Sequence, residues 1–272
     1  MIKSTNFLLC STHHDPEFKL KNLLKKVASI IKKLFIKTIV CLTPTTSEKV
    51  YKFLSREGFM VIIGSSMRQI DIYRKALKTT LNNIEKQQTE KIFYIDFDRL
   101  IHWIHAYPNE LTNLINKKID VDYLHIGRTS RAFDTHPSTQ QKTEIIINEI
   151  VSKTLGFLET KDIISVCGIF TKELGEKIMR VKNETATGFY CTWPLFFWNW
   201  ATKKQYIEVE GLEWETPDKF KVEITELGYK EWVKQFQSPL EWEKRVRFLH
   251  EGLLELSQVS DFKFCEKSNN SK

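Results

Sequence analysis

The chain has 272 residues, of which 42% are hydrophobic and 28% charged, a composition that is typical of a folded globular protein and excludes a largely disordered one. The net charge of +7 is compatible with an anionic partner such as a nucleotide, a phospholipid surface or nucleic acid, and does not choose among them. No run approaches the roughly 18 apolar residues of a membrane-spanning helix, so we expect any lipid contact to be peripheral.

The spacing and surroundings of the cysteines indicate the cellular compartment. The five cysteines lie far apart and without metal-ligand spacing, at Cys10, Cys41, Cys167, Cys191 and Cys265. Four of them stand in apolar surroundings, where a thiol behaves as a small hydrophobe. The sequence therefore predicts a reduced, cytoplasmic protein, with a frayed polar tail over 266–272.

Strand-like and helix-like segments alternate through the first half. Short apolar runs predict strands over 7–10, 38–42, 59–63 and 91–95. Longer periodic segments predict helices over 17–35, 46–56 and 70–84. This order predicts an α/β fold with a mainly parallel central sheet flanked by helices. Ligands of such sheets bind beyond the carboxyl ends of the strands, which here means 11–15, 43–46, 64–66 and 96–98.

The helix predicted first is unusually basic. The stretch from Lys19 to Lys37, which overlaps this helix, carries seven lysines and no acid, and its apolar residues repeat every 3.6 positions. A packed helix with a solvated basic face is one interpretation. A helix that lies on a membrane surface or binds a partner is the other.

The second half is less regular. It predicts strands over 121–126 and 205–209 and helices over 139–155, 172–180 and 239–256. The aromatic segment 189–200 is either packed core or a platform for an acceptor. Because no linker or repeat is visible, we expect one domain over 1–272, with a nucleotide-binding half (1–125), an acceptor half (126–235) and a C-terminal helix and tail (236–272).

Two acids at the end of the fourth predicted strand are the sharpest chemical signal. Asp96 and Asp98 stand two residues apart, so an extended strand would point both carboxylates the same way. Mg²⁺ and Mn²⁺ prefer oxygen ligands and often bridge carboxylates and phosphates. In the other interpretation, Asp96 caps the next helix and Asp98 forms a salt bridge.

Other polar residues leave alternatives open. His13 and Asp15 follow the first strand, where they contact a base or ribose or simply form a turn before Pro16. The segment 127–137 carries Arg128 and Arg131, which suit a diphosphate if the segment is more than a solvated loop. His102 and His105 are spaced either to share a metal or to pack on a helix. P-loop, dinucleotide-binding and serine-hydrolase motifs are absent.

The order of these motifs resembles that of GT-A-fold glycosyltransferases, especially the family-two type that includes polyprenyl-phosphate sugar transferases. The similar positions are Arg74 in the helix before the fourth strand, the Asp96-Phe-Asp98 sequence, the turn at 126–128, Asn148, the segment Asp162–Gly168 and the segment Gly188–Tyr190. The resemblance extends over roughly residues 5–215. It departs at Thr192, where the family has an acidic catalytic base.

The resemblance implies metal-dependent transfer of a sugar from a nucleotide diphosphate-sugar to an unknown acceptor. Asp96 and Asp98 would hold Mg²⁺ or Mn²⁺. The implied nucleotide and diphosphate contacts are Thr12, His13, Asp15, Ser65, Arg74, Asp96, Arg128 and Arg131. Glu213, Glu215 and Asp218 are the candidate bases. A sugar nucleotidyltransferase and a non-catalytic nucleotide-sugar-binding protein remain alternatives, and no nucleic-acid partner is expected.

Overall fold

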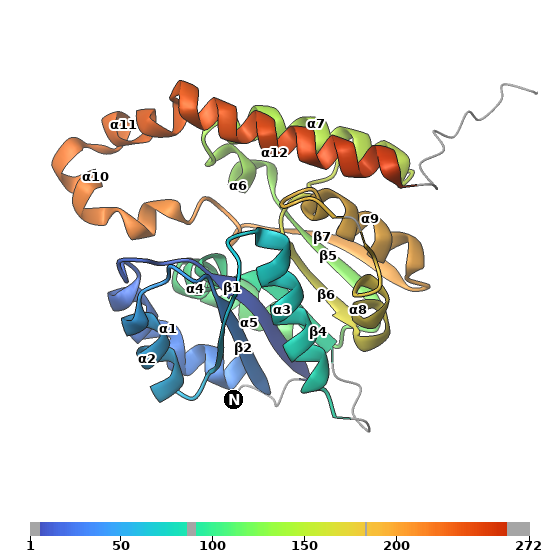
Figure 1. Cartoon of the computed structure of the whole chain (residues 1–272), viewed down its shortest axis with the longest axis horizontal. Helices are drawn as coiled ribbons and strands as arrows, with labels where there is room; N and C mark the ends of the chain where they lie inside the picture. Colours follow the sequence, from blue (N-terminus) through green and yellow to red (C-terminus); the bar gives the residue numbers. More distant parts are fainter. Residues whose placement is uncertain (1–5, 86–90, 183, 260–272) are drawn as a thin grey trace, which may run out of the picture.

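A seven-stranded mixed sheet is the centre of the fold, with strand order β3-β2-β1-β4-β6-β5-β7 (Figure 1). The computed structural model of the chain describes residues 6–85, 91–182 and 184–259. Its strands are β1 (Phe7–His13), β2 (Lys37–Leu42), β3 (Met60–Ile63), β4 (Lys91–Asp96), β5 (Tyr123–Arg128), β6 (Cys167–Thr171) and β7 (Lys204–Val209). The predicted α/β class is confirmed.

The sheet is parallel except at β6. Strand β1 pairs in parallel with β2 and β4, β2 with β3, and β5 with β7, whereas β6 runs antiparallel to both β4 and β5. This reversed strand forms at the end of the apolar stretch 163–170, whose structure the sequence left unassigned. The prediction of a mainly parallel sheet holds.

Helices cover both faces of the sheet (Figure 1). They are α1 (Lys21–Leu34), α2 (Glu48–Arg56), α3 (Gln69–Asn82), α4 (Phe97–Ala106), α5 (Pro108–Asn116), α6 (Ser130–Asp134), α7 (Ser138–Thr154), α8 (Lys172–Ile178), α9 (Phe189–Trp200), α10 (Lys221–Leu227), α11 (Tyr229–Trp232) and α12 (Pro239–Gln258), with 3₁₀ turns η1 (Thr216–Lys219) and η2 (Val233–Gln237). The predicted helices are present with shifted ends.

Alternation along β1 divides its side chains between two cores. Phe7 and Leu9 pack with α1, α4 and α5 on one face, and Leu8 and Cys10 pack with α3, α8 and α9 on the other. Strand β1 also continues past the predicted Cys10, so Thr12 and His13 are buried members of the sheet rather than parts of a loop. This extension changes the expected role of both residues.

The basic helix α1 packs as an amphipathic helix. Its apolar side buries residues that include Leu24 and Ile31, while most of its lysines are exposed. The packed interpretation is confirmed, and membrane contact stays a prediction. Among the described residues, none of the helices has the length and apolar character needed to cross a bilayer.

The aromatic helix α9 packs on the sheet with one side and contacts the C-terminal helix with another. Helix α9 buries Phe189, Trp193 and Phe197 against the sheet, so the core interpretation of this segment is confirmed. A smaller cluster joins α9 to α7 and α12, and α7 and α12 lie side by side above the carboxyl ends of β1 and β4 (Figure 1). These helices enclose the space in which a ligand of the sheet would lie.

The four described cysteines are buried free thiols, as expected for small apolar side chains. Cys265 and the predicted tail 266–272 lie outside the described residues. The proposed division of the chain at 125/126 and 235/236 stays a prediction.

Candidate active site

The acid pair at the end of β4 is arranged differently from the prediction. Strand β4 ends at Asp96 and helix α4 begins at Phe97, so Asp98 belongs to the first helical turn. The expectation that strand alternation aligns the two carboxylates is therefore wrong. The structure instead gives each acid a different set of partners.

Asp96 is held by two hydroxyls and faces one cation. Its Oδ1 atom accepts hydrogen bonds from Thr12 Oγ1, at 3.2 Å, and from the Tyr73 hydroxyl. The Oδ2 atom lies 4.0 Å from Nε of Arg99, one helical turn further on. Burial raises the pKa of Asp96 to about 6, and the opposing charge of Arg99 offsets only part of this effect.

Asp98 is bound by a lysine. Its Oδ2 atom lies 2.5 Å from Nζ of Lys219, at the end of η1, and about a fifth of each side chain is exposed. Burial alone would raise the pKa of Asp98, but the Lys219 ammonium outweighs it and holds that pKa well below its usual range. The alternative interpretation of Asp98, a salt bridge, describes what is found.

The partners of Asp96 and Asp98 determine whether this pair can bind the predicted Mg²⁺ or Mn²⁺. A divalent cation at Asp98 would approach the carboxylate oxygen that already contacts the Lys219 ammonium, and the two positive charges would repel each other. The described part of the chain also brings no third Asp, Glu, His or Cys together with this pair in a metal-binding group. The residues as arranged do not fit a divalent cation.

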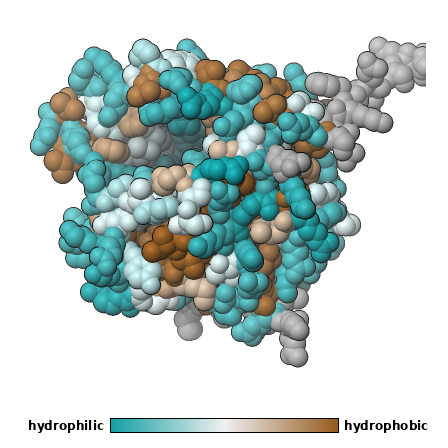
Figure 2. Space-filling model, viewed as in Figure 1, coloured by the Kyte–Doolittle hydropathy of each residue, from teal (hydrophilic) through white to brown (hydrophobic). Residues whose placement is uncertain are grey.

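A cavity of about 390 Å³ opens beside Asp96, whereas Asp98 does not line it. Its polar lining includes Asp96, Arg99, His136, Gln140, Glu144 and Glu215. Aromatic side chains complete the wall, namely Tyr190, Trp214, Phe236 and Phe248. Figure 2 shows this face of the molecule hollowed between the C-terminal helices and the α/β body. A mixed apolar and polar wall of this kind is typical of small-molecule sites.

The three candidate bases have different surroundings. Glu215 lines the cavity, its Oε2 atom lies 3.8 Å from Nε of Arg99, and that oxygen accepts no hydrogen bond from the described residues. Glu213 and Asp218 both contact His102, at 3.1 and 2.7 Å. Of the three, Glu215 is the carboxylate that lines the cavity, and its Oε2 atom is buried beside Arg99.

The position at which the resemblance places an acid is occupied by a paired threonine. Thr192 is buried, and its hydroxyl donates to Oε2 of Glu255 on α12, at 2.9 Å. The Oε1 atom of Glu255 accepts from the backbone and the hydroxyl of Thr185. An acid thus lies beside Thr192, but it is buried and joins α12 to α9 rather than lining the cavity.

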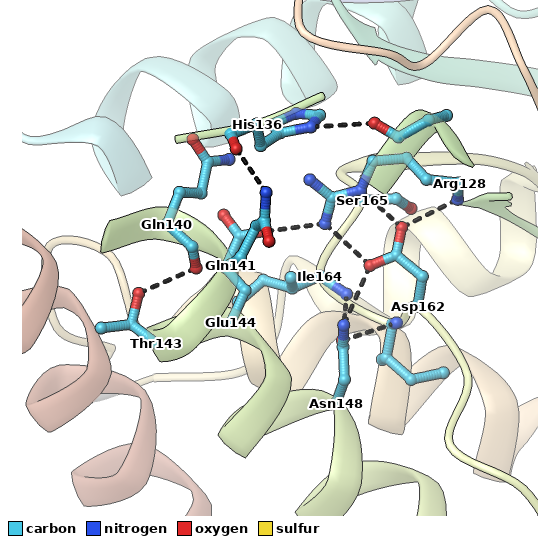
Figure 3. A network of polar contacts seen from close by, with 12 residues as sticks. Arg128, His136, Gln140, Gln141, Thr143, Glu144, Asn148, Asp162, Ile164 and Ser165 are labelled. Carbon is cyan, nitrogen blue, oxygen red and sulfur yellow. Dashed lines mark hydrogen bonds and ion pairs between the residues drawn. The ribbon is translucent and has the colours of Figure 1, made fainter. Parts of the chain in front are cut away.

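Arg128 is part of the core. It ends β5 instead of starting a loop, and the preceding Gly127 is required because a Cβ there would lie 2.3 Å from the Tyr206 hydroxyl oxygen. The Arg128 guanidinium donates to Asp162, with distances of 2.7 and 2.8 Å, and to Glu144 at 2.7 Å. Figure 3 shows these two acids around the guanidinium. Its charge is thus matched within the protein, and we do not retain Arg128 as a diphosphate contact.

Arg131 is half-exposed on α6 and lies apart from the acid pair. Its guanidinium contacts Glu210 and Glu213 and donates to the Tyr107 hydroxyl. Like Arg128, it is paired with carboxylates of the protein. The structure does not bring either arginine to Asp96.

The remaining predicted contacts are distributed along the sheet edge. Asp15 accepts from the backbone of Lys19 and Leu20 and so fixes the chain before α1. Arg74 binds Glu184 and two carbonyls of the segment after α8, and Ser65 is exposed after β3. Of the predicted nucleotide contacts, Thr12 and Asp96 are joined by a hydrogen bond, and Nε2 of His13 lies 4.0 Å from Oδ2 of Asp15.

His13, the last residue of β1, is a further predicted nucleotide contact. It is buried, and its ring packs edge-on against Phe97 with 5.3 Å between the ring centroids. Neither ring nitrogen forms a hydrogen bond within the described residues. Burial lowers the pKa of His13 to about 4, and the charge of Lys219 acts in the same direction. The imidazole is therefore neutral at physiological pH.

Sequence reasoning missed Arg99, Lys219, Tyr73 and His136. Arg99 had a signal, because a residue three positions after Asp96 on a helix lies on the same side. Lys219 and Tyr73 reach the acids only through tertiary structure. His136 lines the cavity, and its buried Nε2 atom has no hydrogen-bond partner among the described residues.

Comparison with known proteins finds similarity in structure alone. No protein-family model matches the chain, and no curated protein matches its sequence. Glucosyl-3-phosphoglycerate synthase from Mycobacterium tuberculosis, in complex with Mg²⁺ and uridine diphosphate, is 9% identical with a TM-score of 0.47 over 75% of this chain and 70% of that one. The same enzyme with uridine diphosphate alone is 10% identical, with a TM-score of 0.36 over 62% of this chain.

A further solved structure, described as a mycobacterial protein, is 11% identical with a TM-score of 0.43 over 82% of this chain and 74% of that one. The chain spans 58% of the length of the synthase bound to uridine diphosphate alone. Similarity to polyprenyl-phosphate sugar transferases stays a prediction.

Proposed function

We propose that the chain transfers a sugar from a nucleotide diphosphate-sugar to the hydroxyl group of an acceptor. The observation that supports this most is that Asp96 and Glu215, with Arg99 close to both, line one cavity at the carboxyl edge of a mainly parallel sheet. Ligands of such sheets bind at this edge. The order of sequence motifs favours the same activity.

In this proposal Glu215 is the general base. Its carboxylate accepts the proton of the acceptor hydroxyl while the hydroxyl oxygen forms a bond to the anomeric carbon. The bond from that carbon to the donor phosphate breaks, and the nucleoside diphosphate leaves with the electron pair. A positioned carboxylate typically contributes about 10² to 10⁴ in rate to such a step.

Asp96 has a binding role in this proposal. Thr12 and Tyr73 fix its Oδ1 atom, so the carboxylate has a defined orientation and its Oδ2 atom can accept a hydrogen bond from a sugar hydroxyl. Arg99 keeps Asp96 and Glu215 from repelling each other. Tyr190 and Trp214 supply apolar surface on the cavity wall.

The test is a panel of nucleotide-sugars, free nucleoside diphosphates and pairs of a nucleoside triphosphate with a sugar phosphate, each with EDTA or with Mn²⁺. Thermal shift reports binding, since a ligand at about 100 times its Kd adds roughly 2.7 kcal/mol of stability. Release of nucleoside diphosphate reports transfer to water or to added acceptors. Asp96→Asn is the matched variant for donor binding.

The outcomes separate the alternatives. Donor binding with release of nucleoside diphosphate supports the proposal. Binding without any turnover supports a non-catalytic nucleotide-sugar-binding protein, and release of pyrophosphate from a nucleoside triphosphate and a sugar phosphate supports a nucleotidyltransferase. If no nucleotide-sugar binds under either condition, the proposal is wrong.

A further inference from the structure

One histidine in the wall of the cavity has a ring nitrogen without a partner. His136 follows α6, lines the cavity and is only 4% exposed. Its Nε2 atom is buried and forms no hydrogen bond with the described residues. A buried polar atom without a partner is costly to the fold. Such an atom in a cavity wall therefore indicates a ligand group that pairs with it.

The contacts of the His136 ring determine which nitrogen carries the proton. Its Nδ1 atom lies 3.2 Å from the backbone carbonyl oxygen of Ala132. A carbonyl oxygen can only accept, so Nδ1 donates, and the neutral ring has its lone pair on Nε2. The ring also stacks on Phe133, with 6.4 Å between the ring centroids. These contacts fix the orientation of the ring, and Nε2 points away from the Ala132 carbonyl.

The charges around His136 select the kind of group that can pair with it. Burial, and then the guanidinium charges of Arg128 and Arg99, hold the pKa of His136 well below its usual range, so the ring is neutral. Arg128 packs on the same Phe133 ring, with its guanidinium carbon 4.7 Å from the centroid, and Figure 3 shows it beneath His136. Two positive charges this close would repel an ammonium group or a metal ion at Nε2. The group that fits is a neutral hydrogen-bond donor, such as a hydroxyl.

We propose that His136 determines the specificity of the cavity, because its Nε2 atom accepts a hydrogen bond from a hydroxyl group of a bound sugar substrate. This inference rests on the proposed function for the identity of the ligand as a sugar. Asp96 and Glu215 line the same cavity as carboxylates, and His136 adds an acceptor that carries no charge. A site that hydrogen-bonds a substrate hydroxyl rejects an analogue that lacks it much more strongly than an apolar wall does.

The test removes the acceptor from the protein and the donor from the ligand. His136→Phe keeps a planar ring without the lone pair, and His136→Gln keeps an acceptor oxygen on a side chain of similar reach. The ligands are the nucleoside diphosphate derivatives of glucose, galactose and mannose. Each is compared with its deoxyfluoro analogues, in which a fluorine replaces one hydroxyl and cannot donate. Calorimetry on the full chain measures the affinity for each ligand.

The wild type should bind one of these analogues about tenfold or more weaker than its parent, because that analogue leaves Nε2 unpaired. In His136→Phe the parent and that analogue should bind almost equally, and His136→Gln should restore much of the difference. A purely structural role of His136 would weaken both ligands alike, so the ratio of the two affinities is the decisive measurement. His250→Phe, on the exposed side of α12, is the matched control and should leave the ratio unchanged.

Both the donor sugar and the acceptor carry hydroxyl groups, and a second arm distinguishes them. Release of nucleoside diphosphate is measured against the concentration of free glucose, galactose or mannose as acceptor, and of their deoxyfluoro analogues. An effect of His136→Phe on the affinity ratio of the donors assigns the hydroxyl to the donor sugar. The same effect on the KM ratio of the acceptors assigns it to the acceptor.

The nitrogen signals of His136 provide a readout that does not need the phenylalanine variant to fold. In wild-type protein with isotope-labelled histidine, Nδ1 should be the protonated nitrogen at neutral pH. The Nε2 signal, assigned by its absence in His136→Gln, should shift upfield when the sugar binds, because its lone pair then accepts a hydrogen bond. If His136→Phe is misfolded by circular dichroism, this shift decides the question.

The inference is overturned if Nε2 carries the proton in the free protein, or if His136→Phe changes neither ratio. Its failure differs from that of the proposed function. Turnover of a nucleotide-sugar with both ratios unchanged leaves the transferase and defeats this role of His136. If no nucleotide-sugar binds, the transferase is wrong, and free glucose, galactose and mannose are tested for the same shift of Nε2. A shift with one of these sugars then supports the inference, and no shift with any of them defeats it.

Discussion

The Nε atom of Arg99 lies 3.8 Å from the Oε2 atom of Glu215, and this contact joins the first helix after β4 to the segment after β7. The same guanidinium lies near Asp96, and it donates to the backbone carbonyl of Ser165 before β6. A single buried cation thus connects three parts of the chain at one cavity. Its position explains how two carboxylates can face a shared space.

The first prediction separates Glu215 from the neighbouring acids. Glu215→Gln should lower turnover of a nucleotide-sugar by about a hundredfold or more, because an amide cannot accept the acceptor's proton. Donor affinity should change little, since the amide keeps the shape of the side chain. Turnover and binding are measured separately on the same preparation.

Glu213→Gln is the matched control for that variant. Glu213 lies two residues earlier and contacts His102 and Arg131 instead of lining the cavity, so its loss should change turnover much less. Equal turnover of Glu215→Gln and the wild type would remove Glu215 from the proposed mechanism. A large loss in Glu213→Gln alone would move the base to that residue.

Asp96 should reduce the stability of the fold at neutral pH. The pKa of Asp96 is raised in the folded protein from 3.8 to about 6. The free energy of unfolding therefore decreases as pH rises from about 4 through 6, because the carboxyl ionises over this range. Asp96→Asn removes this cost, and its amide oxygen can still accept from Tyr73. The variant should be more stable than the wild type by on the order of 1 kcal/mol at pH 7.

Urea unfolding of both proteins between pH 4 and pH 7.5 measures this difference. The gain should be near zero at pH 4 and should grow with pH, while nucleotide-sugar binding is weakened throughout. Thr12→Val is a useful control, because it removes one hydrogen bond to the carboxyl and leaves the ionisable group. A gain that is constant with pH would show that ionisation of Asp96 is not its cause.

Local sequence patterns were sufficient for every strand of the described sheet except β6 and for most of the longer helices beside it, and they were insufficient for the partners of the site residues. The strand ending at Asp96 could be predicted, since apolar strand patterns are local. That the salt-bridge partner of Asp98 is Lys219 could not, because the lysine lies more than a hundred positions away in the sequence. The partners of Arg128 could not be predicted either, because the acids that pair with it belong to α7 and to the segment before β6.

Arg128 should be required for stability. Arg128→Met removes the cation from the buried carboxylates of Asp162 and Glu144, and an uncompensated buried charge typically costs about 3–5 kcal/mol. Arg131→Met is the exposed counterpart and should cost about 1 kcal/mol or less. Chemical denaturation compares the two. Similar losses would mean that the network in Figure 3 is not a principal support of the fold.

His102 should make the attachment of the Glu215-bearing segment dependent on pH. Burial alone would lower the pKa of His102. The hydrogen bond and negative charge of Asp218, at 2.7 Å, and the hydrogen bond of Glu213, at 3.1 Å, outweigh burial, so the pKa of His102 is raised above 6.5. A raised histidine pKa means that protonation favours the folded state. This contribution is therefore complete below about pH 6.5 and is lost as pH rises through the higher folded-state pKa.

His102→Gln removes that contribution while keeping a polar side chain on α4. The wild type should exceed this variant in unfolding free energy by about 1–2 kcal/mol at pH 6, and the difference should shrink towards pH 9. Hydrogen exchange of residues 211–219 in the wild type, corrected for the intrinsic pH dependence, should show less protection at pH 9 than at pH 6. His105→Gln, on the exposed side of the same helix, should leave both measurements unchanged. If the stability difference for His102→Gln stays constant across this range, the histidine supports the segment by packing alone, and the attachment of that segment does not depend on its proton.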